Sequence, residues 1–151
     1  MQEEEWERVI DTNLKGAWLM AREVGSQMIE YNISGRIINI ASVIGVKTSA
    51  KRVLAYSVSK AGLVSLTQSF ALELAEKGIC VNAIGPGFFP TELTQIVFED
   101  AERSKRNADQ TCIGRNGEME DLDGPLLFLC SEASRYVTGQ VLMVDGGFTA
   151  K

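Results

Sequence analysis

Histidine is absent from the sequence. Its absence excludes Ser-His-Asp and Cys-His nucleophile systems and most zinc hydrolases. Cysteine is scarce: Cys80, Cys112 and Cys130 are odd in number, lie far apart and form no C-x-x-C pair. Neither a disulfide framework nor a zinc site is therefore expected. Acid–base chemistry near neutral pH would have to come from a tyrosine, lysine, cysteine or carboxylate with a shifted pKa.

Long apolar runs and excess positive charge are also lacking. No apolar run approaches the ~20 residues that span a bilayer, and the acidic start MQEEEWERVI does not resemble a signal peptide. We therefore expect a cytoplasmic protein. The net charge is −5 and the basic residues are not clustered, which makes nucleic acid and anionic membranes poor partners. The 151 residues, 45% of them hydrophobic, fit one soluble domain over 1–151.

Helical and strand patterns alternate along the chain. Apolar residues recur every three or four positions over 3–30, which predicts one long helix. Short apolar segments at 35–42, 79–87 and 139–147 are typical of strands covered on both faces. The alternation predicts an α/β fold with a parallel sheet and crossover helices.

Three further helices are expected between and after these strands. One runs from about residue 55 to Lys77 and stops at Gly78. A second is opened by Pro90-Thr91, and a third lies within 119–134, weakened by Gly124-Pro125. Because ligands of parallel sheets bind beyond the carboxyl ends of the strands, the segments after residues 42 and 87 are expected to form the rim of a site.

Tyr56 and Lys60 lie four positions apart in the helix that follows Ser42. This spacing puts both side chains on one helix face. An isolated tyrosine is a poor base at pH 7, but a neighbouring ammonium favours the phenolate and makes it a usable general acid–base. A serine hydroxyl at the same point could hold a carbonyl oxygen. Asn13 points inward with the apolar stripe of 3–30, where it either satisfies a helix kink or belongs to a site.

Five motifs occur in order: NLKGAW, GRIINIASVIG, YSVSKAGL, VNAIGPGFFPT and VTGQVLMVDGG. Together they resemble the short-chain dehydrogenase/reductase family over almost the whole chain. The resemblance implies a partial Rossmann-type, doubly wound parallel sheet made of the family's last three strands. It also implies hydride transfer between NAD or NADP and an alcohol or ketone, most similar to the sugar-acid and 3-oxoacyl branches.

The resemblance assigns roles to four residues of the acid–base centre. Tyr56 matches the catalytic acid–base, and Lys60 matches the lysine that assists it and binds the nicotinamide ribose. Ser42 matches the serine that orients the substrate oxygen. Asn13 matches a helix asparagine that holds a water in a proton relay to the lysine.

Further residues match the family's nicotinamide-binding segment: Pro86, Gly87, Phe89 and Thr91. Read alone, Thr91 would be a helix N-cap before Glu92-Leu93. Residues 92–117 are expected to form the substrate loop. Gly146-Gly147 match a C-terminal turn with a structural role.

The sequence contains no G-x-G-x-x-G, the turn on which the pyrophosphate of a dinucleotide normally rests. In the family this turn belongs to an N-terminal part that the resemblance does not cover. Weak or absent cofactor binding is therefore expected, together with a bare edge on the first strand. Two hypotheses stay open. The chain is either an oxidoreductase whose missing half must be supplied, or an inactive remnant that pairs with itself or with full-length relatives.

Overall fold

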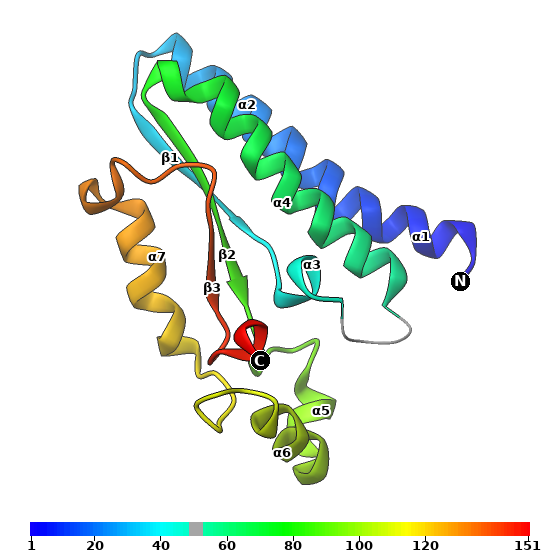
Figure 1. Ribbon diagram of the computed structural model, residues 1–151. Coiled ribbons are helices and arrows are strands. Elements are labelled where there is room, and N and C mark those ends of the chain that lie inside the picture. Colours follow the sequence, from blue (N-terminus) through cyan, green and yellow to red (C-terminus); the bar gives the residue numbers. More distant parts are fainter. Residues whose placement is uncertain (49–52) are drawn as a thin grey trace.

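A three-stranded parallel sheet forms the middle layer of the protein (Figure 1). The computed structural model describes residues 1–48 and 53–151. The sheet has the order β1 (Gly35–Ile40), β2 (Ile79–Pro86), β3 (Val141–Val144). Both pairs are parallel, with Ile37 opposite Val81 and Ala83 opposite Val141. The predicted α/β fold with its three adjacent strands is thereby confirmed.

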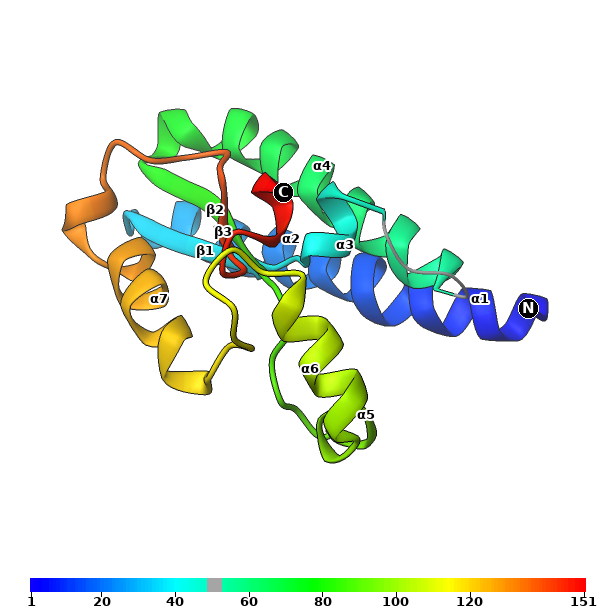
Figure 2. The same ribbon diagram turned by 60° about the horizontal axis from the view of Figure 1, so that its bottom comes forward.

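The N-terminal helices and α4 (Leu54–Leu74) cover one face of the sheet, and α7 (Asp123–Cys130) covers the other (Figures 1 and 2). A core cluster between α2 (Gly16–Glu30), α4 and the strands includes Ala21, Phe70 and Ile79. Because both faces are covered, the strands are apolar throughout, as the sequence pattern indicated.

The long helix predicted over 3–30 is confirmed, with one irregularity. It consists of α1 (Glu3–Ile10), a π-helical turn η1 (Asp11–Lys15) and α2 (Gly16–Glu30). Single π-helical turns inside α-helices occur frequently at functional sites. Asn13 stands in this turn.

The helix predicted to stop at Gly78 also does so. After α4 the chain tightens into a 3-10 turn, η2 (Ala75–Lys77), and Gly78 takes a left-handed conformation with φ 72°. Glycine adopts this conformation without a steric penalty, which is why it ends helices so often.

Two helix predictions need correction. The helix predicted to open at Pro90-Thr91 begins later, as α5 (Gln95–Glu99), and α6 (Ala101–Asp109) follows it. Thr91 is not an N-cap, because its amide donates to the Thr94 hydroxyl at 2.8 Å and closes a turn before the helix. Gly124-Pro125 does not weaken α7 but lies in its first turn, where a proline removes no helical hydrogen bond.

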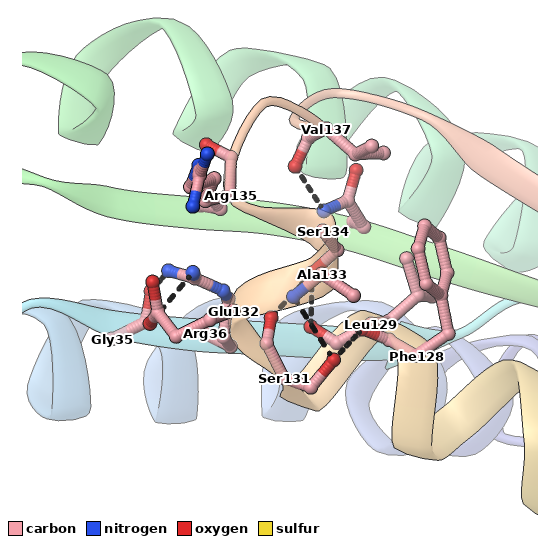
Figure 3. A network of polar contacts seen from close by, with 12 residues as sticks. Gly35, Arg36, Phe128, Leu129, Ser131, Glu132, Ala133, Ser134, Arg135 and Val137 are labelled. Atoms are coloured by element: carbon pink, nitrogen blue, oxygen red, sulfur yellow. Dashed lines mark hydrogen bonds and ion pairs between the residues drawn. The ribbon is translucent and has the colours of Figure 1, made fainter.

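Short elements complete the chain: α3 (Val43–Val46), η3 (Met119–Leu122), η4 (Glu132–Ser134) and η5 (Phe148–Ala150). At the start of β1, Arg36 donates to the Gly35 carbonyl and pairs with Glu132 of η4 at 3.3 Å (Figure 3). Ser131 caps η4 by accepting from the Ala133 amide. The Arg36–Glu132 pair ties the connection between α7 and β3 to the amino end of β1.

Strand β1 has one neighbour, β2, within residues 1–48 and 53–151. Its outer edge is therefore unpaired in that part of the chain, although helices cover both of its faces. In the same residues no helix has the length and apolarity to cross a membrane.

Candidate active site

Tyr56 and Lys60 share one face of α4, near its first turns. The Lys60 ammonium lies 5.7 Å from the centre of the Tyr56 ring. It also donates a 2.6 Å hydrogen bond to the carbonyl of Ile40, the last residue of β1. Burial lowers the pKa of the Lys60 ammonium below its ordinary value. The Tyr56 side chain is 38% exposed. Helix α4 thus presents a half-buried cation beside an accessible phenol at the carboxyl end of β1.

Ser42 lies at the same corner, directly after β1. It is buried and serves as the N-cap of α3, where its hydroxyl accepts the Ile44 amide at 3.2 Å. Helix α3 packs closely on α4 at Gly45. A Cβ built on this glycine would come within 2.7 Å of the Lys60 carbonyl group. This contact, together with the bond from Lys60 to Ile40, brings the serine loop next to the Tyr56–Lys60 pair.

Asn13 reaches the same helix from its π-helical turn. Its amide donates to the Ser59 hydroxyl at 3.1 Å, and that hydroxyl donates to the Tyr56 carbonyl at 2.8 Å. Ser59 is fully buried. The Asn13 side chain thus bonds to α4 through Ser59, next to the backbone of Tyr56, and its role in a site stays a prediction.

The sequence analysis missed Ser59. The available signal was its position between Tyr56 and Lys60, on the turn of the helix that faces Asn13. A fully buried hydroxyl needs hydrogen-bond partners. The Ser59 hydroxyl accepts from the Asn13 amide and donates to the Tyr56 carbonyl.

The residues expected at the nicotinamide are less clearly grouped. Gly87 follows Pro86 at the end of β2 and donates its amide to Val144 at 2.9 Å. A Cβ built on Gly87 would lie 2.8 Å from the Asp145 Cα, so only glycine fits this crossing. Pro86 and Gly87 thus lie at the same end of the sheet as Ser42, in the neighbouring strand.

Phe89 and Thr91 engage other partners. The Phe89 ring is buried, and a Cβ built on Gly117 would lie 2.5 Å from that ring. The hydroxyls of Thr91 and Thr94 are 2.9 Å apart. Both Phe89 and Thr91 therefore hold the segment after β2 in place by internal contacts.

A cavity of about 360 Å³ lies beside Phe88 and Phe89. Its wall also includes Ile113, Arg115 and Met143, and it includes none of Ser42, Tyr56 and Lys60. These three residues of the acid–base corner thus lie outside the lining of this cavity. Among the residues with described placement, no cluster of three or more Cys, Asp or Glu side chains could hold a metal ion.

Comparisons with known proteins identify the family to which this fold belongs. A family model described as Enoyl-(Acyl carrier protein) reductase matches residues 1–149. The chain belongs to the short-chain dehydrogenase/reductase family. The resemblance drawn from the five motifs is therefore confirmed.

Two curated relatives illustrate the range of the family. The 3-oxoacyl-(acyl-carrier-protein) reductase FabG of Aquifex aeolicus is 40% identical over 143 residues, which are 95% of this chain and 56% of the relative. The 2-dehydro-3-deoxy-D-gluconate 5-dehydrogenase of Dickeya dadantii is 40% identical over 149 residues, 99% of this chain and 58% of the relative. The chain therefore spans less than three fifths of the length of these relatives.

Solved structures also resemble this chain over nearly its whole length. A gluconate 5-dehydrogenase from Burkholderia cenocepacia, in complex with NADP and tartrate, has a TM-score of 0.95 and 34% identity, over 100% of this chain and 58% of that one. A 4-hydroxyisoleucine dehydrogenase complexed with NADH also has a TM-score of 0.95 and 34% identity, over 99% of this chain and 61% of that one. The structural relatives thus include proteins that bind NADP and proteins that bind NADH.

Proposed function

We propose that this chain carries the acid–base centre of an NAD(P)-dependent oxidoreductase that interconverts an alcohol and a ketone. The observation that carries the proposal is the Lys60 ammonium, which is fixed on the Ile40 carbonyl and lies over the Tyr56 ring. The accessible phenol of Tyr56 exchanges a proton with the substrate oxygen. The hydroxyl of Ser42 keeps its own proton free to donate, because its bond within α3 uses the oxygen as an acceptor. That proton orients and polarises the same substrate oxygen.

Asn13 acts in this scheme by holding the turn that carries Tyr56. Its bond to Ser59, and the bond of Ser59 to the Tyr56 carbonyl, fix the start of α4 against the N-terminal helix. A water placed between Asn13 and Lys60 would complete the proton relay that the family resemblance implies.

The residues present fit the nicotinamide-ribose end of NAD or NADP. The Lys60 ammonium has three donors, and Ile40 takes one of them; the others would bind ribose hydroxyls of the dinucleotide. A bound nicotinamide supplies or accepts the hydride. Nothing comparable is present for the pyrophosphate, because the sequence has no G-x-G-x-x-G turn. We therefore propose that the chain alone binds either dinucleotide weakly.

Substrate class follows from the relatives named above. A sugar acid and a 3-oxoacyl thioester are the two candidates, since relatives of both kinds are about 40% identical. Residues 92–117, which include α5 and α6, stand beside this end of the sheet (Figure 2) and would cover the substrate.

The test combines the chain with the part that the relatives possess in addition. The amino-terminal segment of the Aquifex aeolicus reductase is fused in front of residue 1, and NAD(P)H oxidation is followed with a keto sugar acid and with a 3-oxoacyl thioester. Tyr56→Phe should lower turnover by roughly 10²–10⁴-fold. Tyr31→Phe is the matched control, because Tyr31 is 67% exposed at the end of α2. Equal activity of the two variants would refute the assignment of Tyr56.

A second measurement tests the cofactor proposal on the chain itself. NADH and NADPH are titrated by fluorescence against the unmodified protein. Millimolar or undetectable binding is expected. Micromolar binding would contradict the statement that this chain lacks most of the affinity for the dinucleotide.

The unpaired edge of β1 favours a second candidate function. Long exposed strand edges promote association, and apolar side chains are also exposed on the helices, among them Met20, Leu72 and Leu127 at 65%, 82% and 69%. The alternative is an inactive protein that pairs with itself or with a longer relative. Sedimentation at several concentrations, alone and mixed with the Aquifex aeolicus reductase, would reveal such pairing. A monomer in both cases would exclude it.

A further inference from the structure

The C-terminal turn, residues 145–151, is stabilised by hydrogen bonds within the turn itself. Two consecutive glycines with positive φ, Gly146 at 60° and Gly147 at 82°, reverse the chain after β3. The Asp145 carboxylate accepts the amides of Gly147 and Thr149, each at 2.9 Å, and the Thr149 hydroxyl at 2.6 Å. The sequence analysis assigned Gly146-Gly147 a structural role only, yet the turn makes contacts on both sides.

On one side the C-terminal turn binds the end of the expected substrate loop. The Gly146 carbonyl accepts the amides of Cys112 and Ile113 at 2.7 and 3.2 Å. The Lys151 ammonium donates to the carbonyls of Asp109 and Thr111 at 2.9 and 3.1 Å. These four bonds fix residues 109–113, which comprise the last residue of α6 and the stretch that follows it.

On the other side the C-terminal turn binds the serine loop. Lys47, the C-cap of α3, donates to the carbonyls of Phe148 and Lys151 at 3.3 and 2.5 Å. Its ammonium also lies 5.2 Å from the centre of the buried Phe148 ring, within the range of a cation–π contact. The helix that Lys47 ends is the one that Ser42 caps.

Three segments far apart in sequence therefore meet at this place: α3, residues 109–113 and the C-terminal turn. Figure 1 shows the C-terminal turn between α3 and the α5–α6 arm. Lys47 is the one side chain that reaches from α3 into this junction through hydrogen bonds, among those that the structure describes. We propose that Lys47 is a positioning residue: through the C-terminal turn it sets the base of the substrate loop relative to Ser42.

This inference rests on the proposed function only where it calls residues 92–117 a substrate loop. The link from Lys47 through the C-terminal turn to residues 112–113 depends on the hydrogen bonds alone. Lys47 holds the turn, and the turn holds the amides of Cys112 and Ile113. Loss of Lys47 should loosen that stretch locally, while the sheet stays intact, since Lys47 makes no described bond to a strand.

Hydrogen exchange of the full chain, read by mass spectrometry on overlapping peptides, tests whether Lys47 holds residues 112–113 in place. In Lys47→Ala, the Cys112 and Ile113 amides should exchange about tenfold faster, while the β2 amides keep their rates. Lys47→Arg, which keeps the cation, should restore most of the protection. Lys77→Ala is the matched control, because Lys77 is exposed in η2 just before the amino end of β2, whereas the C-terminal turn follows the carboxyl end of β3. Unchanged exchange at residues 112–113, or equal acceleration throughout the sheet, would overturn the proposal.

The fusion described above provides the functional readout. Lys47→Ala should raise KM for the keto substrate by about tenfold while kcat changes less than about threefold, because positioning of the loop affects binding more than proton transfer. Lys77→Ala should change neither. A fall in kcat at constant KM would contradict a positioning role. If the fusion shows no turnover at all, the proposed function fails, and the hydrogen-exchange result still decides whether Lys47 positions the loop.

Discussion

The contact of α3 with α4 at Gly45 offers the sharpest test of how the serine loop is placed. A Cβ built on Gly45 would lie 2.7 Å from both the carbonyl carbon and the carbonyl oxygen of Lys60, and 3.1 Å from the Ala61 nitrogen. These are backbone atoms of α4, which cannot turn aside as a flexible side chain can. Gly45→Ala must therefore push α3 away from α4.

The expected cost follows from two opposing terms. Overpacking of this kind costs about 1–3 kcal/mol, and the better helix propensity of alanine returns at most about 1 kcal/mol. A net loss of about 1–2 kcal/mol should remain, which in a chain of this size lowers Tm by roughly 2–8 °C. Because Ser42 caps α3, the displacement also moves the serine hydroxyl.

Thermal and urea unfolding, followed by circular dichroism, measure this loss. Gly124→Ala is the matched control, since a Cβ on Gly124 meets nothing within 4 Å; with no overpacking to oppose it, the helix propensity of alanine should raise stability by up to about 1 kcal/mol. Gly62→Ala should fall between the two, because its Cβ would meet the methyl groups of Leu14, 2.9 Å away, rather than backbone. A Gly45→Ala protein as stable as the unmodified chain would refute the close packing of α3 on Lys60.

Two further predictions concern polar contacts. Thr67→Val should cost about 1–3 kcal/mol in urea unfolding, because it leaves the buried Asn39 amide, now 2.9 Å from the Thr67 hydroxyl, without its partner. Thr67→Ser keeps the hydroxyl and should lose less, and equal losses would contradict this reasoning. The hydrogen bond from Arg115, followed by that from the Glu118 amide, lowers the pKa of Asp121 to about 2. A carboxylate whose folded pKa is depressed stabilises the protein above its unfolded pKa of about 4 and loses that contribution as the pH falls toward 2. The Tm difference between the unmodified chain and Asp121→Asn should therefore shrink over that interval, and a constant difference would count against the ion pair.

Much of the secondary structure follows from local sequence. The three strands, the long N-terminal helix and the stop at Gly78 were predictable, because hydrophobic periodicity and the left-handed preference of glycine act over a few residues. Helix starts were less predictable. Threonine is a suitable N-cap residue, but the Thr91 amide donates to the Thr94 hydroxyl, and the helix begins only at Gln95.

The sequence by itself determined that Tyr56 and Lys60 share a face, since 3.6 residues per turn leave no other arrangement on a helix. It also determined the family, through five motifs in order. Only the tertiary structure decided that the Lys60 ammonium binds the Ile40 carbonyl, that Asn13 reaches Ser59 through a π-helical turn, and that the Phe89 ring packs against Gly117. Each of these contacts joins elements that are distant in the chain, and their distances depend on how helices and strands dock, which no local pattern specifies.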